Sequence, residues 1–291
     1  MIESTPPPVQ NEVSGFDEWA AIARTYEPER YLAATLAPEP QRSSLIALAA
    51  YAGDLARIAA TATQPMLGEI RLQWWRDSFD VIGKGGRIGS PLADALAGAI
   101  QAHQLPLPML VAMSEARAWD LYDDAMQDQA ALDGYLAKID AIPFELALRT
   151  MGMPARDAGR LSLPAGRLWG QVRLLAQLPA HLSAGRIPLT AARLSTYGVT
   201  SDVLLAGTMT PDVRVMITGL TDELAQNFAS LRPQLRSLSR HHRIAVLPLA
   251  VIPAYLRAIQ RRSRDPLRDI AALAPMVRVW RSARGHAFGW F

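Results

Sequence analysis

Apolar residues recur at the spacing of an α-helix along almost the whole chain. In one stretch they stand three or four positions apart, at Leu45, Leu48, Tyr51, Leu55 and Ile58, which places them on one face of a helix. No run of strand length alternates apolar and polar residues. The sequence therefore predicts an all-α protein.

Prolines and glycines divide this pattern into separate helices. Turns are expected where they cluster, at residues 38–40, 83–89, 106–108, 152–154 and 185–188. Helices are expected over residues 16–36, 42–58, 65–81, 91–103, 108–121, 132–151, 155–182, 211–240 and 247–280. Since no segment repeats at a fixed period, the predicted architecture is an irregular helical bundle and not a solenoid.

The composition is that of a chain with one large core. Of the 291 residues, 50% are hydrophobic and 20% are charged, so a single helical domain over residues 16–285 is expected. The polar, proline-rich residues 1–15 are expected to form a disordered tail, and residues 286–291 a C-terminal tail. Cysteine is absent, which excludes disulfides and favours the cytoplasm. The sequence contains no run of about eighteen uncharged apolar residues, so no membrane span is predicted.

The segment from Arg232 to Phe291 is strongly basic. It holds twelve arginines against Asp265 and Asp269, a charge of +10, whereas the whole chain has +3 and the remainder therefore −7. This asymmetry favours an anionic partner, such as a lipid surface or an acidic protein. The alternative is a solvated arginine face balanced by an acidic face of the same domain. No nucleic-acid recognition module accompanies the arginines, so nucleic acid is not an expected partner.

Four of these arginines recur at i, i+4, i+7 and i+11, namely Arg257, Arg261, Arg264 and Arg268. That spacing predicts a helix with one cationic face, of the kind that lies on an anionic membrane or partner. Aromatic residues near the C-terminus would add an apolar anchor; they are Trp280, Phe288, Trp290 and Phe291. The alternative is a bundle helix with a solvated basic face and a frayed tail.

Four segments carry distinctive motifs: Arg30–Ala33, Gln41–Arg42, Ala47–Ala52 and Gly68–Asp77, the last with a tryptophan–arginine run. Together they resemble the first three helices of the squalene/phytoene synthase family. Further segments resemble later helices and a turn of that family; they are Trp119–Leu121, Tyr135–Leu136, Gly185–Leu189 and Pro248–Arg257. The resemblance spans residues 16–270, so it implies the isoprenoid synthase fold for the whole chain.

The resemblance also says which residues prenyl transfer would need. Active family members join two prenyl diphosphates head to head, and Mg²⁺ held by aspartates on two facing helices bridges the leaving diphosphate. Carried onto this sequence, the functional positions of both motifs lack carboxylates: Ile58, Ala59 and Ala62 in the first, Arg173, Gln177 and His181 in the second. This implies a member that has lost catalysis and needs neither metal nor other cofactor.

A branch of the family with similarly degraded motifs includes an assembly factor for respiratory complex I, and Gly68–Asp77 resembles that branch. The implied role is binding, with a protein partner or an anionic membrane surface, in the cytoplasm and peripheral to the inner membrane. An isoprenoid or lipid ligand in the central cavity is also implied. The alternative is an active, Mg²⁺-dependent squalene or phytoene synthase whose metal is held by acidic residues elsewhere.

Basic groups remain at or near the degenerate motifs. Guanidinium groups match phosphate oxygens, so a diphosphate or phospholipid head group is a candidate ligand of Arg57, Arg173, His181 and Arg186. The alternative is that these side chains form ion pairs between neighbouring helices.

Two other groups were considered as sites. Trp74 and Trp75 are adjacent large aromatics and are expected to fill the core. Four aspartates have the spacing of one helical face, which would suit a metal; they are Asp120, Asp123, Asp124 and Asp128. Aspartates just ahead of a helix are more typical of N-caps and turns, and this is the interpretation we favour for them.

Overall fold

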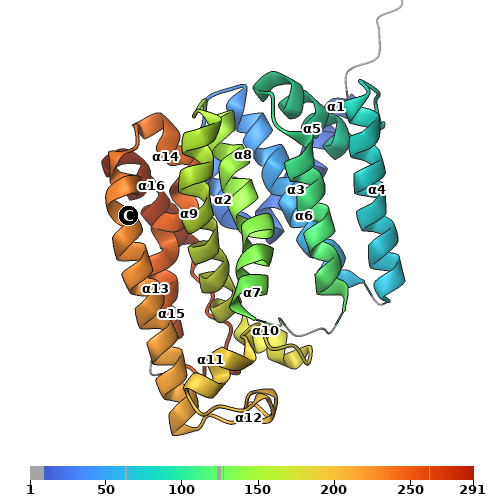
Figure 1. Ribbon diagram of the computed structural model, residues 1–291. Helices are drawn as coiled ribbons and strands as arrows, with labels where there is room; N and C mark the ends of the chain where they lie inside the picture. The colour runs from blue at the N-terminus through green and yellow to red at the C-terminus, as the bar shows by residue number, and fades with distance from the viewer. Residues whose placement is uncertain (1–9, 63, 123–125, 127, 262) are drawn as a thin grey trace, which may run out of the picture.

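The computed structural model describes residues 10–62, 64–122, 126, 128–261 and 263–291, with side chains from residue 15 onward. Every regular element in these residues is a helix, which confirms the predicted all-α class (Figure 1). Two of the short elements, η1 and η3, are 3₁₀-helices, and η2 is a π-helix. The elements are α1 (Gln10–Tyr26), α2 (Pro28–Ala34), α3 (Gln41–Thr61), α4 (Pro65–Gly83), α5 (Pro91–His103), α6 (Leu107–Arg117), η1 (Ala118–Leu121), α7 (Gln129–Leu136), η2 (Ala137–Ala141), α8 (Ile142–Thr150), α9 (Ala155–Ala176), α10 (Leu178–Ser183), α11 (Ala191–Thr196), α12 (Ser201–Leu205), α13 (Pro211–Ser237), α14 (Arg240–Val246), η3 (Leu247–Val251), α15 (Ile252–Ile259) and α16 (Pro275–Phe288).

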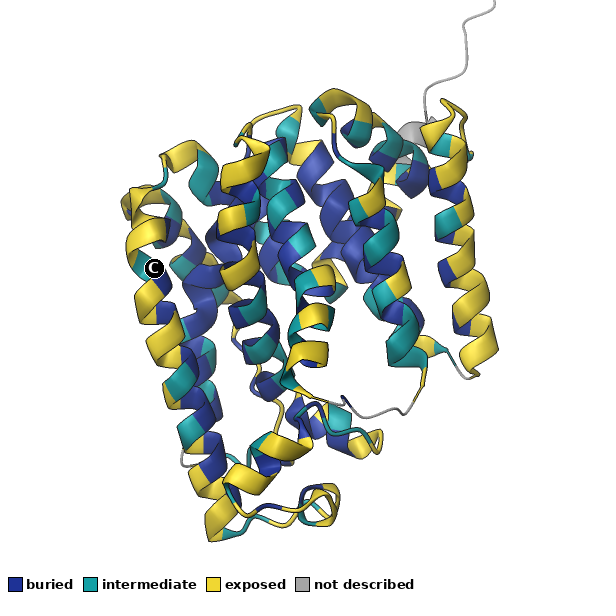
Figure 2. Cartoon of the chain, viewed as in Figure 1, coloured by how far each residue is buried: buried dark blue, intermediate teal, exposed yellow. Residues whose placement is uncertain are grey.

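The centre of the bundle is formed by α3, α8 and α9. Every residue of α3 from Ser44 to Leu55 is buried, as expected of a helix that is apolar on all sides. In Figure 2 these central helices are mostly buried, whereas α4 and α13, at opposite edges of the bundle, turn exposed faces outward. Two segments, Gln41–Thr61 and Arg240–Ile259, are apolar and long enough to cross a membrane, but 72% of each tested window is buried inside the bundle, as in core helices.

Prolines set several helix boundaries. α4 and α5 begin at Pro65 and Pro91, as predicted, because proline in the first turn lacks only an N–H that has no partner there. Two predicted helices are each split in two. Residues 16–36 divide at Glu27, before Pro28. Residues 155–182 divide at Gln177, because Pro179 has no N–H to donate to the carbonyl of Leu175.

The helical pattern over residues 247–280 does not form one continuous helix, because η3, α15 and the start of α16 occupy only parts of it. After α15 ends at Ile259, residues 260, 261 and 263–274 form turns and irregular chain. Side chains of Asp265 and Asp269 accept hydrogen bonds from the backbone N–H groups of Leu267 and Asp265, respectively, and such local bonds compete with helix formation. The predicted cationic helix face therefore does not form, and the four arginines assigned to it lie on α15 and on this irregular segment: Arg257, Arg261, Arg264 and Arg268.

Both predicted tails are too long. α1 begins at Gln10, so residues 10–15 are helical, and residues 1–9 lie outside the described residues. At the other end α16 continues to Phe288, and Phe291 is buried beside Gly285. Phe291 is therefore part of the fold and not an exposed anchor.

Candidate functional site

A cavity of about 410 Å³ lies among α3, α7, α9, α10, η1 and η2. Ala59 of the first degenerate motif lines it, as do Arg173, Gln177 and His181 of the second. The two motifs thus meet at one cavity, which is the arrangement that the family resemblance implies.

The other two positions of the first motif do not line the cavity. Ile58 is buried in the core and Ala62 caps the end of α3. The face of α3 that does line it carries Ala56, Ala59 and Ala60, at the i, i+3, i+4 spacing of one helical face. This wall consists of methyl groups, none of which binds a cation.

The opposite wall depends on two glycines of α9. A Cβ atom on Gly166 would lie 2.2 Å from Cα of Ala141, and one on Gly170 would lie 2.6 Å from Oδ2 of Asp140. Because neither glycine has a side chain, the π-helix η2 packs directly on α9. The close packing brings the carboxylate of Asp140 to the cavity wall.

That carboxylate belongs to a buried network of two acids and two arginines. Arg173 Nη1 lies 3.0 Å from Oε1 of Glu27 and 3.1 Å from Oδ1 of Asp140. Arg30 Nε lies 3.0 Å from Oε2 of Glu27, and its guanidinium group stands 4.3 Å from the ring centroid of Phe144. Burial opposes ionisation of Glu27, but Arg173 and Arg30 hold its pKa below the ordinary value. Burial raises the pKa of Asp140 in spite of the same arginines.

A second cluster holds Asp120, whose carboxylate also lines the cavity. Arg117 Nη1 lies 2.7 Å from Oδ2 of Asp120, and the hydroxyl of Tyr135 donates to its Oδ1. Arg186 Nη1 donates to the backbone oxygen of Asp120 at 2.8 Å. Among the residues that the structure describes, the two carboxylates that line the cavity, those of Asp120 and Asp140, are therefore paired with arginine.

Two nitrogen atoms at the cavity are buried without a hydrogen-bond partner in the described part of the chain. They are Nε2 of His181 and Nε of Arg186. Burial, followed by the charge of Arg186, lowers the pKa of His181, so its imidazole is neutral at neutral pH. Buried polar groups are normally satisfied, so these two nitrogens keep unused hydrogen-bonding capacity at the cavity.

The proposed anion-binding residues do not all come together. Arg173, His181 and Arg186 line the cavity, whereas Arg57 lies at a separate surface hollow. There Arg57 Nε donates to Oδ1 of Asp54 at 3.1 Å, an ion pair within α3 and not between helices. Arg173 is the arginine that forms the expected ion pairs between elements, with Glu27 and Asp140.

The neighbouring tryptophans have different environments. Trp75 is buried, as predicted, and donates from Nε1 to Asp54 at 2.9 Å. Trp74 is 42% exposed, so the prediction that it fills the core is wrong. Adjacent residues of a helix point about 100° apart, and only one of the two rings faces inward.

Of the four aspartates considered as a metal site, the two that the structure describes have separate structural roles. Asp120 is paired with Arg117, and Asp128 is the N-cap of α7, where it accepts a hydrogen bond from the N–H of Ala131 at 2.8 Å. Asp123 and Asp124 lie outside the described residues. Within the described ranges no three histidine, aspartate or glutamate side chains are grouped so that they could hold a metal ion.

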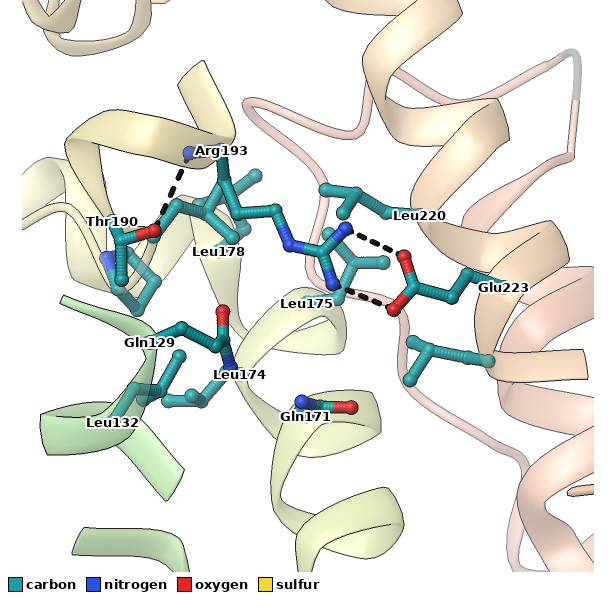
Figure 3. Close-up of a pocket in the computed structure, with 13 residues that line it drawn as sticks. Gln129, Leu132, Gln171, Leu174, Leu175, Leu178, Thr190, Arg193, Leu220 and Glu223 are labelled. Atoms are coloured by element: carbon teal, nitrogen blue, oxygen red, sulfur yellow. Dashed lines mark hydrogen bonds and ion pairs between the residues drawn. The ribbon is translucent and has the colours of Figure 1, made fainter. Parts of the chain in front are cut away.

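A smaller pocket of about 40 Å³ adjoins the cavity and shares Leu132, Leu174 and Pro188 with it. Leucines from several helices surround it, and Arg193 of α11 faces Glu223 of α13 in a two-pronged ion pair with both N–O distances 2.6 Å (Figure 3). This pocket is mostly apolar and is much smaller than the cavity beside it.

Several residues of the cavity and of its ion-pair network were missed by the sequence analysis, among them Arg117 and Asp140 in the wall and Glu27 in the network. One signal for Asp140 is present, since a lone carboxylate stands in the apolar run from Ile139 to Ile142. A buried charge needs a partner, but Arg30 and Arg173 lie 110 and 33 positions away in the chain, and spacing cannot identify partners at such separations.

Comparisons with known proteins agree with this geometry. The Squalene/phytoene synthase family model matches residues 23–281. The protein named NADH dehydrogenase (ubiquinone) complex I, assembly factor 6, from Bos taurus is 26% identical over 253 residues, which cover 87% of this chain and 76% of the relative. The Homo sapiens protein of the same name is 24% identical over 267 residues, 89% of this chain and 80% of the relative.

Solved structures share the fold. Squalene synthase HpnC from Alicyclobacillus acidocaldarius superimposes with a TM-score of 0.74 and 20% identity, covering 88% of this chain and 96% of that chain. A dehydrosqualene synthase in complex with ligand gives a TM-score of 0.79 and 16% identity, covering 96% of this chain and 97% of that chain. These likenesses establish the isoprenoid synthase fold.

Proposed function

The chain belongs to the squalene/phytoene synthase family, and we propose that it acts by binding, in the assembly of a respiratory complex, and not by prenyl transfer. The cavity wall carries this proposal. The positions that would hold metal-binding aspartates present Ala59, Gln177 and His181. Relatives named as complex I assembly factor 6 support the assembly role and a protein partner.

The electrostatics of the cavity support the loss of catalysis. Ionisation of a prenyl diphosphate requires positive charge at the leaving group, which Mg²⁺ supplies when carboxylates hold it. Asp120 and Asp140 are each neutralised by an arginine, so a metal ion would have to displace those arginines. We therefore propose that no cofactor takes part.

The same cavity supports a ligand with a phosphate head. The unpartnered nitrogens of His181 and Arg186 would donate to phosphate oxygens. The apolar side chains of the same 410 Å³ cavity, among them Leu132, Ile139 and Leu174, would contact a hydrocarbon tail. The proposed ligand class is accordingly a phosphorylated isoprenoid or lipid. In this proposal the protein acts in the cytoplasm, peripheral to the inner membrane.

Incubation of the purified protein with farnesyl or geranylgeranyl diphosphate and Mg²⁺ tests the proposal. We expect diphosphate release no faster than in a sample without protein. Without bound Mg²⁺ the protein would not stabilise the negative charge that develops on the leaving diphosphate in the transition state. An active squalene synthase in the same buffer is the positive control.

Release of diphosphate that depends on metal would instead support the alternative, an active squalene or phytoene synthase. Asp120 and Asp140 come from two elements that face the same cavity, and they are the residues that such an enzyme would use.

A further inference from the structure

Helix α16 exposes a row of large apolar side chains at the edge of the bundle, beside α14 (Figure 1). The exposed fractions are 74% for Met276, 61% for Trp280, 64% for Phe288 and, just beyond the helix, 51% for Trp290. The helix contains no acidic residue. Soluble proteins seldom leave several large apolar side chains together in water without a binding role.

The opposite face of α16 is fixed against the domain. Ser282 and Gly285 are buried, and a Cβ atom on Gly285 would lie 3.1 Å from Cβ of Ala250 and 3.2 Å from Cδ2 of Leu247. These small residues let α16 pack closely on η3. The apolar row therefore points away from the core and cannot be buried by a rotation of the helix.

Arginines surround the exposed aromatic rings. The guanidinium group of Arg284 lies 4.2 Å from the ring centroid of Trp290 and 5.6 Å from that of Trp280, and the rings of Phe288 and Trp290 are 4.9 Å apart. Burial, with Arg257 and Arg284 nearby, lowers the pKa of Arg281. In the described part of the chain none of Arg257, Arg281 and Arg284 forms an ion pair with a carboxylate.

We infer that the outer face of α16, together with Trp290 and Arg257, docks on the surface of an anionic lipid bilayer. A helix with an apolar face and flanking cations lies in the headgroup region, with its aromatic rings at the apolar boundary and its guanidinium groups among lipid phosphates. Charge complementarity favours an anionic surface as the binding partner. A second copy of the same face would bring like charges together. The inference gives a contact surface to the proposed membrane location and is independent of the cavity.

Co-sedimentation with vesicles at low ionic strength tests this inference. The full chain should bind vesicles that contain phosphatidylglycerol and not vesicles of pure phosphatidylcholine. Trp280→Ser should weaken binding about tenfold, because it removes one large apolar side chain that would be buried in the bilayer. Arg257→Gln with Arg284→Gln should weaken it roughly thirtyfold, about fivefold for each cation removed, and added salt should reduce this difference.

Ile70→Ser is the matched control. Ile70 is 59% exposed, much like Trp280, but it lies on α4 at the opposite edge of the bundle, so vesicle binding should be unchanged. Circular dichroism of each variant checks that the helices are intact. The inference fails if the protein does not bind phosphatidylglycerol vesicles, or if Trp280→Ser and Ile70→Ser bind them equally well. It also fails if the protein binds an acidic polypeptide such as polyglutamate and does not bind the vesicles. None of these results alters the diphosphate-release test.

Discussion

At the scale of one residue, His181 should make the stability depend on pH. Burial, then Arg186, lower its pKa in the folded chain, and the weaker effect of Asp120 does not reverse this. In the unfolded chain its pKa is about 6.5, so below that pH the unfolded chain binds a proton that the folded chain does not. The free energy of unfolding must therefore fall as the pH drops from about 6.5 to the folded pKa, and then level off. His181→Gln removes this pH-dependent loss of stability. As the pH falls over that range, urea unfolding should therefore show the variant becoming more stable relative to the parent protein. The pKa values of His103, His242 and His286 are also lowered, but their contributions are present in both proteins and cancel. Parallel pH curves for the two proteins would contradict the prediction.

At the scale of the elements, the contact of α9 with η2 should be intolerant of a single methyl group. In Gly166→Ala the new Cβ would lie within 2.5 Å of backbone and side-chain atoms of Ala141. Because backbone cannot move aside cheaply, we expect a loss of about 1–3 kcal/mol in the free energy of unfolding. The matched control is Gly159→Ala on the same helix, where the nearest atom would be Oε2 of Glu145 at 3.5 Å. That variant should be neutral or up to about 1 kcal/mol more stable, because alanine favours a helix over glycine. Thermal melts of both variants check the prediction, and equal stabilities would show that η2 is not held by this contact.

At the scale of the whole molecule, the cavity and the two edges offer separate surfaces. α16 exposes its apolar and basic face at one edge, and α4 exposes Met66, Ile70 and Trp74 at the other (Figure 1). If the protein acts by binding, as proposed, these surfaces should be enough for assembly. In cells that lack this chain, we expect its re-expression to restore the amount of assembled complex I on native gels. An active squalene synthase expressed at the same level should not restore it, because prenyl transfer on the same fold is not the required property. Restoration by that enzyme would overturn the proposed function.

The local pattern of the sequence was enough to identify the class of fold and most helices. The repeat from Leu45 to Ile58 predicted α3, and Pro65 and Pro91 marked the starts of α4 and α5, because helical period and proline chemistry act between near neighbours in the chain. The resemblance to the squalene/phytoene synthase family, and not the periodicity, placed Ala59, Gln177 and His181 at degenerate motifs, and those residues line one cavity.

Only the tertiary structure decided which charges meet. The pairing of Arg173 with Glu27 and Asp140 joins residues 146 and 33 positions apart, and Arg57, which looked equivalent to Arg173, pairs with Asp54 outside the cavity. The spacing of Arg257, Arg261, Arg264 and Arg268 suited a helix, yet hydrogen bonds within the turn around Asp265 replaced it, and α16 presents the basic aromatic face instead. Periodicity is a property of neighbouring residues, whereas burial, ion pairing and the exposed side of a helix depend on what the rest of the chain packs against it.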